Sequence, residues 1–322
     1  MANLYQDHTL TLRGLRFHYL DWGTEGKPPL VCLHGGAQTA HSWDDFAPVM
    51  HNNYHVYALD QRGHGDSDWA PDGDYSRQTQ CEDVAAFVSA LGLPPFILTG
   101  LSMGGINAIT YTARYPEKVR ALIIVDVGPE IETRGRENIQ NFIGGIDELD
   151  SFEAFVERAH RFNPRRSLDN LRQRLSHNLK QLPSGKWTWK FDQKRLGAGG
   201  RSGIGSEGLW EDVRKIHCPT LIVRGGESDI LAPAAAERMR VAIPNSRVTV
   251  VPGATHWVPD GESATVGFAG TQGCGPKLTC TAAPVLSADP VASVTAALAS
   301  VKLCPTSKTQ SVLEVVCRRS HR

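Results

Sequence analysis

The sequence predicts an α/β protein: a mostly parallel sheet with helices on both faces and a helical cap insertion. Short apolar runs alternate along the chain with longer segments of helical periodicity, which is typical of parallel strands joined by helices. A serine flanked by glycines stands where one apolar run passes into a helical segment. The expected strands cover residues 15–20, 30–33, 55–59, 96–98, 121–125, 221–223 and 248–251.

Composition narrows the function classes. The chain has 322 residues, enough for one large α/β domain with an insertion, and its 34 basic and 34 acidic side chains give no net charge. That balance argues against a nucleic-acid or membrane-surface partner. No segment approaches the roughly 18 apolar residues of a membrane span, and the first residues lack the features of a signal peptide. We therefore expect a cytoplasmic protein.

The seven cysteines show neither a disulfide framework nor the paired short spacings of a zinc site. We expect buried free thiols at Cys32, Cys81 and Cys218. The other four crowd the last part of the chain: Cys274, Cys280, Cys304 and Cys317.

Helical periodicity is clearest in residues 78–91, where apolar residues recur every three or four positions. Residues 129–210 resemble a helical cap, whose best helix begins near Asp150 with a capping-box glutamate at Glu153. Phenylalanines on one side of that helix either pack the cap onto the body or form the acyl-side wall of a pocket. The glycine-rich residues 197–208 fit a hinge, because no strand precedes them as a dinucleotide site would require.

The candidate nucleophile is Ser102. Residues 100–104 read Gly-Leu-Ser-Met-Gly and lie between an apolar strand and a helical segment. The glycines allow a turn tight enough to hold the serine hydroxyl clear of the sheet.

A serine needs a base and an acid that orients the base. His256 is the predicted base, because it follows a late strand and a turn. Folds with this serine turn deliver serine, acid and histidine in that order along the chain. Asp229 is the preferred acid, since it closes the turn after the strand at 220–224; Asp126, which also ends a strand, is its rival, and Glu227 is a weaker one.

An acyl-transfer site also needs two backbone N–H donors for the developing oxyanion. Met103 follows the nucleophile and supplies one. Gly36, in the small-residue loop after the strand at 30–33, is the predicted second donor, with Ala37 as its competitor. We expect His34, in the same loop, to brace the loop rather than to catalyse.

With the loop at residues 59–67 (Leu-Asp-Gln-Arg-Gly-His-Gly-Asp-Ser), these motifs resemble the α/β-hydrolase superfamily over residues 10–260, nearest to small carboxylesterases and cofactor-free haloperoxidase-like hydrolases. In that loop Asp60 and Arg62 are expected to form an ion-paired brace. Relatives that open epoxides or displace halide carry aspartate at the elbow, so serine at 102 implies acyl transfer.

The predicted function is a serine carboxylesterase that hydrolyses short to medium acyl esters through an acyl-enzyme on Ser102. No metal or organic cofactor is required, and the expected partner is a small-molecule ester. A lactonase, a hydrolase of carbon–carbon bonds in β-diketones and a non-catalytic receptor are the alternatives. The sequence fixes neither the natural substrate nor the oligomeric state.

We predict a hydrolase core at 1–128 and 211–260, the cap at 129–210, and an atypical tail at 261–322. The tail has one aromatic residue, Phe268, and is rich in small residues. A frame-shifted or recombined end and a genuine extension are both compatible with this composition. Residues 289–303 could form a substitute helix.

Overall fold

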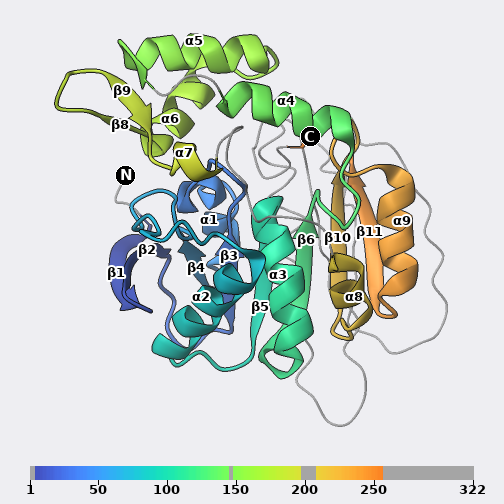
Figure 1. Cartoon of the computed structure of the whole chain (residues 1–322). Coiled ribbons are helices and arrows are strands. Elements are labelled where there is room, and N and C mark those ends of the chain that lie inside the picture. Colours follow the sequence, from blue (N-terminus) through green and yellow to red (C-terminus); the bar gives the residue numbers. More distant parts are fainter. Residues whose placement is uncertain (1–3, 145–147, 197–207, 257–322) are drawn as a thin grey trace, which may run out of the picture.

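The central sheet confirms the predicted fold class. The computed structural model describes residues 4–144, 148–196 and 208–256, and its main sheet has eight strands in the order β1-β2-β4-β3-β5-β6-β10-β11 (Figure 1). The pairs from β4 through β11 are parallel, whereas β1 and β2 pair antiparallel with each other and β2 with β4. The strands are β1 (Gln6–Leu12), β2 (Leu15–Asp21), β3 (Pro29–Leu33), β4 (His55–Leu59), β5 (Phe96–Leu101), β6 (Val119–Val125), β10 (Thr220–Gly225) and β11 (Ser246–Val251).

Helices cover both faces of this sheet. One apolar core joins the sheet to α2 (Arg77–Ala90), α3 (Met103–Arg114), α8 (Leu209–Arg214) and α9 (Pro233–Ala242). A second core lies on the opposite face beneath the short helices η1 (Ala40–Trp43) and α1 (Ala47–Met50). A further short turn, η2 (Pro116–Lys118), leads into β6. Because a parallel sheet exposes apolar side chains on both faces, each face needs such a cover.

Strand β1 is the main-sheet element that the sequence pattern did not reveal. It is an edge strand whose side chains are largely exposed, so its sequence carries no apolar run. Helix α2, by contrast, lies one residue from its predicted bounds. It begins after Ser76, whose hydroxyl accepts a hydrogen bond from the Thr79 N–H at 3.3 Å.

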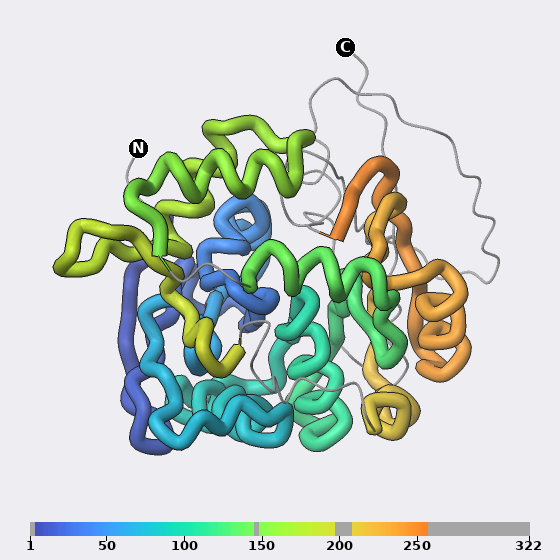
Figure 2. The backbone as a smooth tube through the Cα atoms, turned by 45° about the horizontal axis from the view of Figure 1, so that its top comes forward, coloured from blue at the N-terminus to red at the C-terminus, as the bar shows by residue number. Residues whose placement is uncertain are grey.

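The insertion lies over one end of the strands of the main sheet (Figure 2). It contains α4 (Thr133–Ile143), α5 (Phe152–Phe162), α6 (Leu168–Asn178) and α7 (Gln193–Leu196). The cap is mainly helical, as predicted. The expectation that it contains no further strands was wrong, because β7 (Glu148–Leu149), β9 (Trp187–Trp189) and β8 (Leu179–Gln181) form a small sheet in that order. Strands of two or three residues are too short to produce a recognisable sequence period.

Helix α5 begins close to its predicted start, with Ser151 rather than Asp150 as the residue before its first turn. Two of its phenylalanines lie in different surroundings. Phe155 is buried inside the cap against Trp189, with the ring centroids 5.1 Å apart. Phe162, at the end of the helix, lines a pocket that the cap shares with the body.

Several predictions fall outside the described residues: all but the last residue of the hinge at 197–208, the tail at 261–322, the helix at 289–303 and the four late cysteines. Cys32 and Cys81 are buried free thiols, as expected, and Cys218 is a free thiol that is partly buried. No helix in the described ranges is both long and apolar enough to cross a membrane.

Candidate active site

The turn between β5 and α3 holds Ser102 in a strained backbone conformation. Its φ of 51° and ψ of −116° lie outside the regions that a serine normally adopts. A Cβ on Gly100 would lie 2.2 Å from the Gly104 carbonyl oxygen, and one on Gly104 would lie 2.3 Å from that of Leu33. Both flanking glycines are therefore required by close backbone approach, as the sequence predicted.

Asp126 stands beside Ser102 at the carboxyl edge of the sheet. The Ser102 N–H donates to the carbonyl oxygen of Val125 at 3.1 Å, and Asp126 is the next residue, directly after β6. His256 Nδ1 lies 2.8 Å from Asp126 Oδ2, and both side chains are buried. Because a carboxylate only accepts, Nδ1 carries a proton in this bond, and the neutral form of the ring then has its lone pair on Nε2. A neutral imidazole in this tautomer can accept a proton from a hydroxyl.

Two further donors fix the Asp126 carboxylate. The Gly225 N–H donates to Oδ1 at 2.9 Å, and the Ser228 hydroxyl donates to Oδ2 at 2.5 Å. Asp126 is completely buried, so each of these hydrogen bonds replaces one that water would make. Donors at the end of the neighbouring strand β10 and in the loop after it thus fix the Asp126 carboxylate, in addition to His256.

The prediction that Asp229 orients His256 is not what the structure shows, and its rival Asp126 takes that place. Asp229 Oδ2 accepts from Asn138 Nδ2 of cap helix α4 at 2.9 Å, and its side chain is only partly buried. The weaker rival Glu227 is exposed and forms an ion pair with Arg165. Both acids lie on the loop after β10, one strand further from Ser102 than Asp126.

The loop that carries His256 is set by its contact with the end of β10. A Cβ on Gly225 would lie 2.3 Å from the Thr255 carbonyl oxygen, so the chain before the histidine rests directly on this glycine. The Glu227 N–H also donates to the Ala254 carbonyl oxygen at 2.8 Å. These contacts with the end of β10 direct His256 across that strand toward the end of β6.

The two predicted oxyanion donors belong to segments that lie next to Ser102. Met103 is the first residue of α3, and the first N–H groups of a helix have no acceptor within it. A Cβ on Gly35 would lie 3.3 Å from Ser102 Cβ, which places the loop of Gly36 against the nucleophile. Gln38 Oε1 braces this loop by accepting from the Gly35 N–H at 3.0 Å. The arrangement suits Gly36 and Met103 as a pair of donors, and Ala37, with φ of 59°, continues the same turn.

His34 braces the loop, as its position suggested. Its Nδ1 lies 2.7 Å from the Gly35 carbonyl oxygen, and its Nε2 accepts from the Gln61 N–H at 3.0 Å. Burial lowers the pKa of His34, so the ring stays neutral and keeps one donor and one acceptor. Both nitrogens are therefore occupied by structural bonds.

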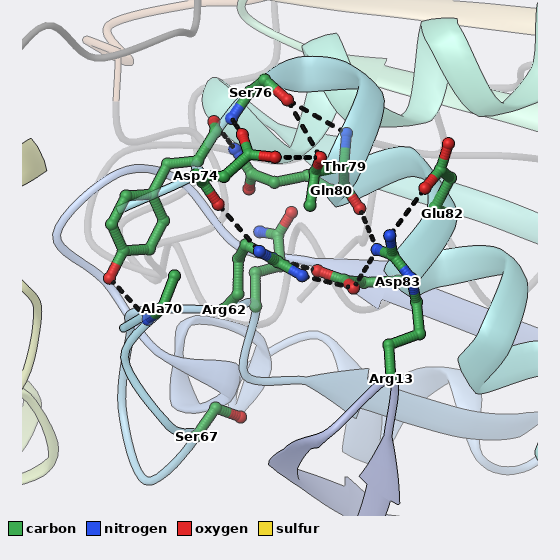
Figure 3. A network of polar contacts seen from close by, with 12 residues as sticks. Arg13, Arg62, Ser67, Ala70, Asp74, Ser76, Thr79, Gln80, Glu82 and Asp83 are labelled. Atoms are coloured by element: carbon green, nitrogen blue, oxygen red, sulfur yellow. Dashed lines mark hydrogen bonds and ion pairs between the residues drawn. The ribbon is translucent and has the colours of Figure 1, made fainter. Parts of the chain in front are cut away.

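Asp60 and Arg62 brace the loop at 59–67, but not through each other. Arg62 forms a buried ion pair with Asp83 of α2, and its Nη1 donates to the Asp74 carbonyl oxygen at 2.7 Å (Figure 3). Asp60 accepts from the Ala40 N–H at 2.6 Å and lies 2.7 Å from His18 Nδ1. The expected pair is thus two separate braces with different partners.

A pocket opens between the cap and the loop of Gly36. Its volume open to a water-sized sphere is about 80 Å³, and Gly36 and Ala37 form part of its wall. The cap contributes mainly apolar side chains, namely Ile139, Phe142, Ile143, Phe162, Leu171, Leu175 and Trp189. Arg166 and Arg174 also line it. This pocket therefore combines a mainly apolar wall with two cationic side chains.

Comparison with known proteins identifies the family of the chain. A family model described as alpha/beta hydrolase fold matches residues 28–262. Esterase Rv0045c of Mycobacterium tuberculosis is 34% identical over 216 residues, covering 65% of this chain and 69% of that protein. The sn-1-specific diacylglycerol lipase ABHD11 of Mus musculus is 29% identical over 253 residues, covering 76% of this chain and 80% of that protein.

Solved structures share the fold over about four-fifths of the chain. The crystal structure of E-2-(acetamidomethylene)succinate hydrolase superposes with a TM-score of 0.72 at 24% identity, covering 80% of this chain and 94% of that one. The crystal structure of esterase Rv0045c gives a TM-score of 0.65 at 28% identity, and the superposition covers 81% of this chain and 87% of that one. The first of these likenesses speaks for the fold alone.

Proposed function

The chain belongs to the alpha/beta hydrolase fold family, and from this premise we propose that it is a serine carboxylesterase acting on short to medium acyl esters through Ser102. Relatives named as esterases and other hydrolases place it among hydrolases. The observation that carries the proposal is the 2.8 Å bond between His256 and Asp126 beside the strained serine turn.

In the proposed first step the Ser102 hydroxyl attacks the ester carbonyl carbon while His256 Nε2 takes its proton. Asp126 keeps the proton of His256 on Nδ1 and stabilises the imidazolium that forms. The carbonyl electron pair moves to oxygen, where the N–H groups of Met103 and Gly36 receive the negative charge. A single such donor contributes about 10² to 10³ in turnover in other acyl-transfer enzymes.

Collapse of this tetrahedral intermediate expels the alcohol, which takes the proton from His256. Water then attacks the acyl-enzyme with the same histidine as base, and the carboxylic acid leaves with Ser102 restored. Every proton transfer uses groups already at the strand edge, so the scheme calls on no further cofactor.

The pocket supports the preference for short to medium acyl groups. Its apolar wall from the cap offers favourable burial to methylene groups, at about 0.8 kcal/mol for each one. The space is enclosed by Phe142, Phe162 and Trp189, whose bulk limits the length that fits. Activity should therefore rise with the first few carbons and fall for long chains.

A panel of p-nitrophenyl esters of graded acyl length tests the proposal, with a lactone and a β-diketone included. We expect the short and medium esters to be cleaved fastest and Ser102→Ala to abolish the activity. Ser89→Ala, an exposed serine of α2, is the matched control and should behave as the wild type. Full activity in Ser102→Ala would refute the role of this serine, and cleavage of only the diketone would identify a carbon–carbon hydrolase.

A second candidate is a substrate that also carries a carboxylate. Arg166 and Arg174 line the pocket, and Arg174 Nη2 already donates to Asp45 at 2.9 Å, which fixes its position. Guanidinium groups bind carboxylates in a bidentate manner. A relative named 2-(acetamidomethylene)succinate hydrolase, from Mesorhizobium japonicum and 27% identical, is named for a succinate derivative.

The two candidates differ in charge dependence. The test compares a p-nitrophenyl hemiester of glutaric acid with the uncharged ester of equal length, in the wild type and in Arg166→Gln. If the substrate is anionic, the variant should raise KM about tenfold for the hemiester only. Arg165→Gln changes the adjacent exposed arginine and serves as the control. Equal KM values for both esters in the wild type would favour the neutral ester.

A further inference from the structure

Two clusters in the described part of the chain contain three groups with metal-ligand chemistry. One joins His18, Asp60 and Asp66, and the other joins His41, Asp44 and His177. In the first, both nitrogens of His18 are already bonded to carboxylates, at 2.7 Å and 3.1 Å, and Asp60 receives backbone N–H groups. The first cluster is therefore a completed structural network.

The second cluster is less satisfied. His41 Nδ1 lies 3.0 Å from Asp44 Oδ2, and the His177 ring stacks on the His41 ring with the centroids 3.5 Å apart. Within the described ranges, neither ring nitrogen of His177 makes a hydrogen bond to another residue. One ligand atom from each of the three residues lies within 4.8 Å of the others. Two imidazoles and a carboxylate, with both nitrogens of His177 unclaimed by the described residues, form a donor set that suits Zn²⁺.

Local structure explains why these groups meet. His41 belongs to the 3₁₀ helix η1 and Asp44 follows it directly, and residues three apart in such a helix lie one above the other. His177 lies in the last turn of cap helix α6. About 3.3 Å separates ligand atoms around a tetrahedral ion with bonds of about 2.0 Å, so modest side-chain rotations would complete the site.

The cluster lies at the junction of body and cap, close to the loop of Gly36. On the same stretch of α6, Asn178 Nδ2 donates to the Ala37 carbonyl oxygen at 3.3 Å, and Arg174 Nη2 donates to Asp45 Oδ2 at 2.9 Å. His41 also lines the pocket that contains Gly36. The side chains of His41 and Asp44 retain 13% and 20% of their exposure, so an ion can reach them from solvent.

We propose that His41, Asp44 and His177 form a binding site for a divalent transition-metal ion that links cap helix α6 to the body. The three protein ligands leave a fourth position for water. An ion here adds a bond between cap and body beside the pocket, which restrains the cap and slows substrate entry. The ion is regulatory or structural, because the acyl-transfer chemistry does not involve it.

The test uses the full chain after a chelator has removed bound metal and after accessible thiols have been alkylated, so that cysteines do not compete for the ion. This sample is then titrated with Zn²⁺ in an isothermal titration calorimeter. The wild type should bind one equivalent that is lost, or weakened at least tenfold, in His177→Gln and in His41→Gln. His217→Gln, at an exposed histidine remote in sequence from all three ligands, is the control and should keep it. Unchanged stoichiometry and affinity in both ligand variants would overturn the proposal.

Thermal unfolding separates binding from misfolding. Without metal, His177→Gln should unfold at the wild-type temperature, and Zn²⁺ at about 100 times its dissociation constant should raise the wild-type Tm by about 5 °C while leaving the variant unchanged. An equal rise in the wild type and in His177→Gln would place the ion elsewhere. These readouts need no catalytic activity, so they stand or fall separately from the esterase proposal.

Discussion

Two carboxylates at the same edge of the sheet have opposite surroundings. Asp126 is completely buried and receives donors from His256, Gly225 and Ser228, all of which belong to the body. Asp229 is partly buried and bonds to Asn138 of the cap. One carboxylate is fixed toward the histidine, whereas the other fastens the cap to the body.

The difference shows that following a strand does not by itself bring an acid to the histidine. Asp126 follows β6, which pairs directly with the serine-bearing β5, whereas Asp229 follows β10, one strand further away. The loop of His256 crosses β10 because Gly225 lets it rest there, and so the imidazole reaches β6. Which acid it meets depends on this tertiary contact.

The largest expected effect separates the two acids directly. Asp126→Asn should lower kcat by about 10⁴, because an amide at this position favours the wrong tautomer of His256. Asp229→Asn should stay within about threefold of the wild type, since its carboxylate contacts Asn138 instead. Steady-state hydrolysis of the best p-nitrophenyl ester measures both. Loss of activity in Asp229→Asn with an active Asp126→Asn would reverse the assignment.

A pair of glycine substitutions extends the comparison to the backbone. A Cβ on Gly225 would lie 2.3 Å from the Thr255 carbonyl oxygen, and one on Gly135 of α4 would lie 2.1 Å from that of Asp229. Both alanine variants should lose about 1–3 kcal/mol of stability by overpacking. Only Gly225→Ala should also lower kcat, by about 10², because it displaces the loop of His256.

Denaturant unfolding and kinetics on the same samples distinguish these outcomes. In Gly135→Ala the displaced cap helix should change KM and leave kcat near the wild-type value. If Gly135→Ala lowered kcat as much as Gly225→Ala, the division between a catalytic and a cap-fastening acid would fail.

The body shows how far sequence patterns reach. Buried strands such as 30–33 and 55–59 carry continuous apolar runs, and the serine turn carries two glycines that backbone contacts demand, so both were predictable. The edge strand β1 and the short strands of the cap carry no such run. Their existence depends on pairing partners, which a linear pattern does not show.

The choice between the two acids illustrates the same limit. Both residues follow strands and both lie between the serine and the histidine in sequence. Gly225 was a sequence signal for the path of the His256 loop, because a side chain there would clash with that loop. A single glycine near the end of a strand is compatible with many structures, however, so it does not identify the acid. The brace partners of Asp60 and Arg62 were missed for a similar reason, because His18 and Asp83 are distant in sequence.

A smaller effect is expected where Ser228 supports Asp126. Ser228→Ala removes one donor to the buried carboxylate and leaves those of Gly225 and His256 in place. A hydrogen bond to a charged group contributes about 1.5–3 kcal/mol, and part of this loss should appear as roughly a tenfold lower kcat. Ser228→Thr, which keeps the hydroxyl, should recover most of the activity. Equal losses in both variants would show that the hydroxyl does not act through Asp126.

The smallest expected effect lies on the Asp229 side. Asn138→Ala removes the amide that bonds Asp229 to the cap. The acceptor is a carboxylate, but both residues are partly exposed, so competition from water reduces the contribution of this bond to about 1 kcal/mol or less. Thermal unfolding should show a fall in Tm of no more than about 3 °C, with kcat unchanged. Asn141→Ala, on an exposed residue of the same helix, provides the baseline. A large drop in kcat for Asn138→Ala alone would mean that Asp229 influences the catalytic step through the cap, and the contrast between the two acids would then be one of degree.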